Sequence, residues 1–251
     1  MLYVVATPIG CPEDLSLRAL DLLRRADLVI GEERKVVTQL LKHWEATGRP
    51  IELLNEHSDE ADLDHLVSLC KTNETVVLIS DCGTPGFCDP GADLVNRCRK
   101  EKIPVTSVPG ASSLMALLSQ SGFRLDQFFF RGFLPAKTDL RKEALEELQN
   151  FRWPVVLMDT PYRLERTLSE LAQGGFSDRK IVLGLKLTQE EEKVLEGTAS
   201  GLLKDIEGEK AEFILILFPS VDSKPSHQKK IKSERNKASN RKPRKKYPKR
   251  H

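Results

Sequence analysis

The chain has 251 residues, of which 39% are hydrophobic, so it is long enough to form one large or two modest domains with a real core. No run approaches the ~20 apolar residues of a membrane span. The N-terminal stretch MLYVVATPIG lacks the basic segment of a signal peptide. The five cysteines form no CxxC pair and no zinc-type spacing. We therefore expect a cytoplasmic protein with free thiols, no metal and no membrane contact.

The net charge of +2 is unevenly distributed along the chain. Residues 224–251 contain 13 Lys and Arg residues and one acidic residue, Glu234, so this segment carries +12 and the remainder carries −10. Apolar residues almost disappear after Pro219, which is typical of a disordered tail. A mobile basic tail binds phosphates without reading sequence, so RNA is the partner that we expect. The alternative is an appendage that serves only solubility or nonspecific binding.

Short apolar runs alternate with amphipathic segments in the first half of the chain. The pattern predicts strands at residues 2–6, 28–30, 51–54, 75–79 and 105–108. Between them it predicts helices at 17–25, 36–44, 62–71, 92–101 and 114–119. This alternation indicates an α/β fold with a mostly parallel sheet.

The second half has strands that follow one another more closely. The predicted strands are 126–132, 154–158, 181–187, 192–198 and 212–218, with helices at 138–149, 164–172 and 200–206. This spacing indicates a second α/β domain with a mixed sheet. We expect an N-terminal domain at 1–112, a C-terminal domain at 113–221 and a disordered basic tail at 222–251.

The stretch Ser80–Gly91, SDCGTPGFCDPG, lies between a predicted strand and a predicted helix. Its glycines permit unusual backbone angles, and its prolines fix φ and remove donors. A loop of this length is long for a plain connection, so we interpret it as a ligand-binding crevice at the carboxyl end of a strand. Loops 7–10 and 109–113 also follow strands, so they are expected at the same sheet edge. An ordinary strand-to-helix connection is the alternative.

Two other loops carry acids and guanidinium groups. The stretch GEER places Glu32, Glu33 and Arg34 directly after a strand, and DTPYR does the same with Asp159 and Arg163. Such a loop could bind a cation or hold a base with its orienting partner, or it could simply be a solvated helix start. The sequence contains no G-x-G-x-x-G, no G-x-x-x-x-G-K-[ST] and no H-E-x-x-H, which argues against a dinucleotide site, a P-loop ATPase and a zinc protease.

Five stretches in order resemble the tetrapyrrole (corrin/porphyrin) methylase superfamily, and within it the ribosomal RNA small subunit methyltransferase I branch. They are LYVVATPIG (2–10), SDCGTPGFCDPGADLV (80–95), VPGASSLMALLSQSGF (108–123), RGFLPAK (131–137) and DTPYR (159–163). The resemblance implies two α/β domains, S-adenosyl-L-methionine in the cleft between them, and a homodimer. The branch methylates the 2′-hydroxyl of a cytidine ribose in 16S rRNA, so the implied partner is small-subunit rRNA or the assembled small ribosomal subunit.

The resemblance also implies roles for individual residues. The cofactor contacts would be Pro8, Ser80, Asp81, Cys82, Gly83, Pro85, Phe87, Ser112, Ser113, Asp159 and Leu187. In the chemistry, Glu32, Glu33 or Asp159 could accept the proton of the ribose hydroxyl. Arg34 or Arg163 could hold the adjoining phosphate in a bidentate contact.

The substrate-facing motifs depart from those of the branch. Glu32-Glu33-Arg34-Lys35 stands where the branch has E-D-T-R, and DTPYR stands where it has E-S-P-H-R. Methyl transfer is therefore implied more strongly than the specific nucleotide. Two alternatives stay open: a methylase of a tetrapyrrole or another small molecule, and a degenerate member that binds cofactor or RNA without catalysis.

Overall fold

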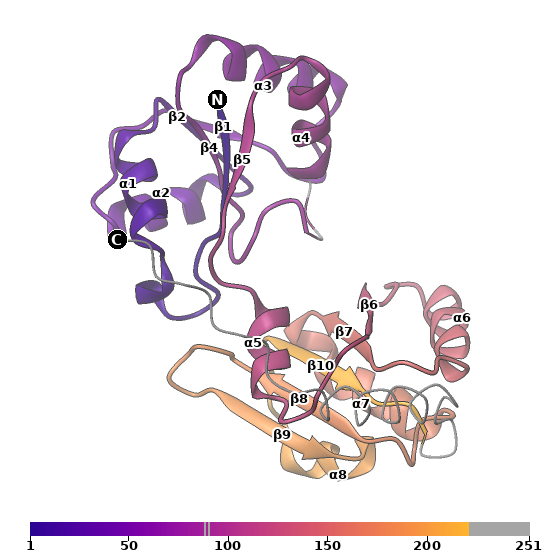
Figure 1. Ribbon diagram of the computed structural model, residues 1–251. Coiled ribbons are helices and arrows are strands. Elements are labelled where there is room, and N and C mark those ends of the chain that lie inside the picture. The colour runs from indigo at the N-terminus through magenta and orange to yellow at the C-terminus, as the bar shows by residue number, and fades with distance from the viewer. Residues whose placement is uncertain (88, 90, 221–251) are drawn as a thin grey trace, which may run out of the picture.

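The computed structural model describes residues 1–87, 89 and 91–220. Its strands form two five-stranded sheets, and Figure 1 shows the two halves joined by the chain that runs from β5 into α5. The N-terminal sheet has the order β3-β2-β4-β1-β5, and all neighbouring strands in it are parallel. Its strands are β1 (Leu2–Val5), β2 (Leu28–Gly31), β3 (Ile51–Leu53), β4 (Val76–Leu78) and β5 (Val105–Val108).

Helices cover both faces of the N-terminal sheet. Helices α1 (Leu17–Arg25) and α2 (Arg34–His43) pack on one face, and α3 (Glu60–Thr72) and α4 (Gly91–Lys100) pack on the other. Strands that are buried on both faces need apolar side chains at every position, which explains the continuous apolar runs in the sequence. The carboxyl ends of these strands are left free to carry the loops of the site.

The C-terminal sheet has the order β6-β7-β10-β8-β9 and is mixed. Only β6 and β7 are parallel, and the other neighbours are antiparallel. Its strands are β6 (Phe129–Phe133), β7 (Val155–Asp159), β8 (Ile181–Leu185), β9 (Lys193–Gly197) and β10 (Phe213–Leu217). None of the helices in the described part of the chain is long and apolar enough to cross a membrane.

The helix α5 (Ser113–Gln120) follows a strand of the first sheet but packs on the second. Its buried Leu114 and Leu117 join Val156, Val182 and Ile216 on one face of the C-terminal sheet. The other face is covered by α6 (Thr138–Gln149), α7 (Leu164–Gln173) and α8 (Ala199–Asp205). This packing supports our proposal of two domains that meet at residues 112 and 113.

The predicted fold class is confirmed by the two α/β halves, one parallel and one mixed. The strand predicted at 126–132 begins later, at Phe129, because its pairing with β7 starts there. The register of this pairing shifts between Phe130 and Gly132, and Gly132 has φ +69°. Two short 3-10 helices, η1 (Pro12–Asp14) and η2 (Pro161–Arg163), were not predicted, since three residues are too few to show a period. The tail predicted at 222–251 lies outside the described residues.

Candidate active site between the two sheets

A cavity of about 220 Å³ lies between the loops of the N-terminal sheet and the C-terminal sheet. Three segments far apart in the sequence meet in it: the loop after β4, the segment after β5 and the loop after β8. They contribute six of the residues predicted to bind a cofactor, namely Cys82, Gly83, Phe87, Ser112, Ser113 and Leu187. The fold therefore assembles one site from motifs that the sequence presents separately.

The central loop is fixed to the loop after β1. Thr7 N–H donates to the carbonyl of Gly83 (2.8 Å), and Gly83 N–H donates back to the carbonyl of Thr7 (3.1 Å). Gly83 has φ +83°, a left-handed conformation that glycine adopts without strain. Thr7 Oγ1 also donates to the carbonyl of Ser80 (3.1 Å). The two loops therefore face the second sheet as one unit.

The other predicted cofactor contacts, Pro8, Ser80, Asp81, Pro85 and Asp159, do not line the cavity. Ser80 is buried, and its hydroxyl donates to the carbonyls of Cys82 (3.2 Å) and Gly83 (3.3 Å). Its position therefore favours a role in shaping the loop. The assignment of all five residues as cofactor contacts stays a prediction.

Part of the cavity lining is polar because α5 begins there with Ser112 and Ser113. Ser112 is the N-cap residue of this helix, yet its side chain makes no capping hydrogen bond. Within the described residues, Ser113 also makes no side-chain hydrogen bond. The N–H groups of a first helical turn have no intrahelical partners and carry partial positive charge. This part of the lining suits a carboxylate.

The C-terminal sheet gives the cavity an apolar wall. Met158, Leu187, Phe213 and Ile214 lie on it together with Gly184 of β8. A Cβ on Gly184 would lie 3.0 Å from Leu117 Cδ1 and from Leu187 Cδ2, so a larger residue would displace this wall. Apolar surface suits an adenine ring, and the helix N-terminus suits an amino-acid carboxylate. The lining therefore fits S-adenosyl-L-methionine.

Glu212 is the single charged residue among the described residues that line the cavity. Burial raises the pKa of its carboxyl group. Sequence reasoning missed this residue, although a lone acid directly before the apolar run FILIL is a visible signal. A carboxylate on the wall favours a cationic ligand, and a sulfonium or ammonium group meets that requirement.

The two acidic loops of the N-terminal half lie against each other beside the cavity. The backbone N–H of Asp81 donates to Glu32 Oε1 (3.3 Å), and the N–H of Glu33 donates to Asp81 Oδ1 (3.4 Å). Burial, and then the charge of Asp81, raise the pKa of Glu32. Burial is also the main cause of the raised pKa of Asp81. A carboxyl group with a raised pKa is better matched to proton transfer near neutral pH.

Arg34 lies at the start of α2, where its Nη2 donates to the carbonyl of Ile51 (3.0 Å) on β3. It is exposed and is close in sequence to the acidic loops, but it does not line the cavity. Among the described residues, no group of three or more His, Cys, Asp or Glu side chains could hold a metal ion. Cys88 lies outside those residues.

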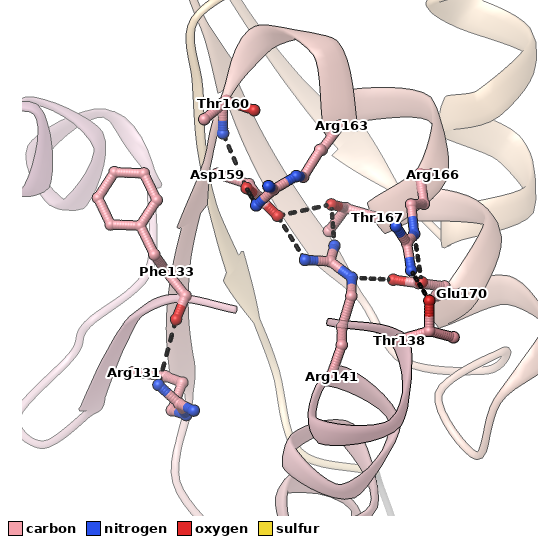
Figure 2. A network of polar contacts seen from close by, with 10 residues as sticks. All are labelled: Arg131, Phe133, Thr138, Arg141, Asp159, Thr160, Arg163, Arg166, Thr167 and Glu170. Carbon is pink, nitrogen blue, oxygen red and sulfur yellow. Dashed lines mark hydrogen bonds and ion pairs between the residues drawn. The ribbon is translucent and has the colours of Figure 1, made fainter. Parts of the chain in front are cut away.

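Asp159 is enclosed by a polar network at the end of β7 (Figure 2). Its side chain is 0% exposed, with Arg141 Nη1 at 2.7 Å from one oxygen and Arg163 Nη1 at 3.1 Å from the other. The N–H of Thr160 also donates to it (2.9 Å), and Thr167 Oγ1 lies 3.5 Å away. This enclosure favours a positioning role for Asp159 over direct contact with a cofactor or proton transfer.

A family model described as Tetrapyrrole (Corrin/Porphyrin) Methylases matches residues 1–203. The chain belongs to this family. Ribosomal RNA small subunit methyltransferase I of Neisseria meningitidis serogroup A is 37% identical over 227 residues, 89% of this chain and 77% of that protein. The Coprothermobacter proteolyticus protein of the same name is 36% identical over 222 residues, 88% of this chain and 99% of that protein. The resemblance seen in the sequence motifs is thus confirmed.

Solved structures of tetrapyrrole methylase type support the fold. Diphthine synthase aligns with a TM-score of 0.66 at 17% identity, covering 87% of this chain and 89% of that chain. Uroporphyrin-III C-methyl transferase from Thermus thermophilus, complexed with S-adenyl homocysteine, aligns with a TM-score of 0.59 at 18% identity, covering 86% and 96%. At such low identity these structures bear on the fold alone.

Proposed function

We propose that this member of the tetrapyrrole methylase family is an S-adenosyl-L-methionine-dependent methyltransferase. Its proposed substrate is the 2′-hydroxyl of a cytidine ribose in 16S rRNA, as free rRNA or in the assembled small ribosomal subunit. The observation that carries the proposal is the cavity, in which a helix N-terminus, a carboxylate and an apolar wall meet. The names of the curated relatives support the rRNA substrate.

The residues that would hold the cofactor divide by chemistry. Ser112 and Ser113, at the start of α5, would bind the methionine carboxylate. Glu212 would offset positive charge, and Met158 and Leu187 would pack against adenine. When bound, S-adenosyl-L-methionine supplies a methyl group that is already activated by its sulfonium. The protein then has to align the acceptor and exclude water.

A ribose hydroxyl needs a base, and the acidic loops supply candidates. Glu32 is a better candidate than Glu33, because burial and the neighbouring Asp81 raise the pKa of Glu32, whereas Glu33 is exposed. We propose Glu32 as the proton acceptor. Arg34 and Arg163 remain our candidates for contacts to the substrate phosphates.

The remaining proposals concern partners and location. The tail at 224–251 would contact rRNA phosphates, so its deletion should weaken RNA binding and flatten the dependence of affinity on salt. An unchanged salt dependence would refute this role. We also propose a homodimer and a cytoplasmic location, as in the branch that the sequence resembles.

The experiment that tests the function is transfer of a radiolabelled methyl group from S-adenosyl-L-methionine to small ribosomal subunits from a strain that lacks this protein. Large subunits serve as the control. Label confined to the small-subunit rRNA supports the proposal. Absence of label, with cofactor binding intact by calorimetry, would refute it and favour a small-molecule substrate or a binding role.

A further inference from the structure

The turn after β7 starts at the wall of the cavity. Met158 lines the cavity, and the next residue, Asp159, pairs with Phe213, which also lines it. The chain then forms η2, in which the N–H of Arg163 donates to the carbonyl of Thr160 (2.9 Å). This short helix fixes Tyr162 and Arg163 at the edge of the candidate site.

The network around Asp159 keeps one net positive charge, because two carboxylates, Asp159 and Glu170, face three guanidinium groups. Arg163 therefore shares the Asp159 carboxylate with the buried Arg141, whose Nη1 lies 2.7 Å from Oδ2. Arg141 is 1% exposed, whereas Arg163 is 30% exposed. Arg163 uses one nitrogen for Asp159, so its remaining donors can form a bidentate contact with a phosphate.

The rest of the network shows that Arg166 makes more contacts within the protein than Arg163 does. Glu170 accepts from Arg141 Nε (2.5 Å) and from Arg166 Nε (2.8 Å), and Arg166 Nη2 also reaches Thr138 Oγ1 (3.4 Å). Figure 2 shows these groups on the α6 and α7 side of the network, away from the Thr160 turn that carries Arg163. Arg166 engages two of its nitrogens within the protein, whereas Arg163 engages one, so Arg166 serves as the control arginine beside the same network.

Tyr162, which precedes Arg163 in the chain, presents an exposed aromatic ring. Tyr162 is 81% exposed. Lys210 Nζ lies 5.7 Å from the centre of its ring and adds positive charge next to it. An exposed aromatic ring with neighbouring cations is a platform on which a nucleobase stacks, and such stacking is worth more for unpaired bases than for a duplex.

We propose that Tyr162 and Arg163 form a nucleotide grip for the substrate RNA, in which Arg163 binds a backbone phosphate and Tyr162 stacks on an unpaired base. Asp159 and the buried Arg141 are positioning residues, since Asp159 holds the guanidinium of Arg163 and Arg141 holds the carboxylate of Asp159. This inference rests on the proposed function, because it assumes an RNA substrate.

The test measures methyl transfer to small ribosomal subunits at several salt concentrations, with calorimetry for S-adenosyl-L-methionine affinity. Arg163→Gln should raise KM about tenfold and reduce the salt slope by about one charge, with cofactor affinity unchanged. Arg166→Gln should change neither quantity. Tyr162→Ala should raise KM several-fold more than Tyr162→Phe, which keeps the stacking face. Equal effects of Arg163→Gln and Arg166→Gln, or of the two Tyr162 variants, would overturn the grip.

A double-mutant comparison tests the positioning role. Asp159→Asn should raise KM in the wild-type background and have no further effect on KM in the Arg163→Gln background. A fall in kcat that persists in the Arg163→Gln background would contradict positioning and return Asp159 to the chemistry. If Asp159→Asn does not fold, the surface variants at Tyr162 and Arg163 decide the proposal alone. If the wild-type protein transfers no methyl group to small subunits, the proposed function fails. If the wild type is active and the variants at Tyr162 and Arg163 have the same KM as the wild type, the proposed function stands and the grip fails.

Discussion

Arg141 and Asp159 form a buried ion pair with 2.7 Å between guanidinium Nη1 and carboxylate Oδ2, and their side chains are 1% and 0% exposed. The pair joins α6 to the end of β7, directly beside the wall of the cavity. A buried charge is costly unless it is paired and hydrogen-bonded, and here Thr167 and Glu170 complete the hydrogen bonds of Arg141. The pair therefore links the stability of the C-terminal domain to the geometry of the site.

Arg141→Ala should lower the free energy of unfolding by about 3–5 kcal/mol, because it leaves the Asp159 carboxylate buried without its main partner. Arg166→Ala breaks an ion pair with the same Glu170 at a more exposed position and should cost about 1 kcal/mol or less. Urea unfolding followed by circular dichroism measures both. Equal losses in the two variants would show that the buried pair has no special weight.

The cleft depends on a close approach between the two halves at Gly10. A Cβ there would lie 2.6 Å from Gln189 Cγ and 2.8 Å from the carbonyl oxygen of Leu187, and both of these residues line the cavity. Gly10→Ala should therefore push the two loops apart and weaken S-adenosyl-L-methionine binding about tenfold, an overpacking cost of about 1–3 kcal/mol. Calorimetry measures the affinity.

Gly201→Ala is the control for the Gly10 substitution. A Cβ at Gly201, in α8, would meet Thr198 Oγ1 at an ordinary 3.5 Å, so this variant should keep wild-type cofactor affinity. Unchanged affinity in Gly10→Ala would contradict the view that this contact sets the width of the cleft.

Glu32 should make stability depend on pH. Its pKa is raised in the folded protein, so the folded state favours the protonated form. The resulting contribution to stability is fully present below the unfolded-state pKa, about 4.3 for Glu, and is lost as pH rises through the folded-state pKa. Glu32→Gln should therefore be more stable than the wild type at pH 7.5, and this gain should disappear at pH 4.

Glu191→Gln controls for the loss of a surface charge. Its hydrogen bond from Lys186 lowers the pKa of Glu191, which is the opposite direction, so this variant should show no gain at pH 7.5. Unfolding curves across pH 4–8 measure the difference. A Glu32→Gln variant that is less stable than the wild type at pH 7.5 would refute the account of this acidic group. If Glu32 is also the base, the same variant should lose turnover.

Glu212 should distinguish the charged cofactor from its neutral product. S-adenosylmethionine carries a sulfonium that S-adenosylhomocysteine lacks, so Glu212→Gln should weaken binding of the former about tenfold more than that of the latter. Burial raises the pKa of Glu212, so this group takes up a proton at a higher pH than an exposed glutamate does. Affinity for S-adenosylmethionine should therefore fall as the pH is lowered through the pKa of Glu212. Calorimetry with both ligands measures this. Equal losses for the two would indicate a contact to a group that they share.

The N-terminal half was predictable because its signals are local. The β-branched run before Ser80 forms β4, and the glycine- and proline-rich loop after it reaches the cavity. Strand ends in a parallel sheet meet at one edge, so three loops could be brought together from the sequence alone. Their exact pairing, such as Thr7 with Gly83, depends on tertiary hydrogen bonds that leave no period in the sequence.

Apart from Leu187, which the family resemblance implied, the residues of the C-terminal wall were not predicted from the sequence. Met158 and Ile214 lie in apolar strands, where a residue facing a cavity has the same sequence signature as one in the core. Arg141 lies in a segment that reads as a charged, solvated helix, yet it is buried because Asp159, Thr167 and Glu170 converge on it from β7 and α7. Likewise, the loop DTPYR suggested a catalytic Asp159, and only its partners indicate a positioning role.

The most direct test of the central claim is to locate the methyl group in rRNA that the protein has labelled. Small subunits labelled with radioactive S-adenosyl-L-methionine would be digested with RNase, and the labelled oligonucleotide would then be treated with alkali. We predict one labelled oligonucleotide that resists alkaline cleavage after a single cytidine, as a 2′-O-methyl ribose requires. Label on a base, at many sites, or absent from the rRNA would contradict the account.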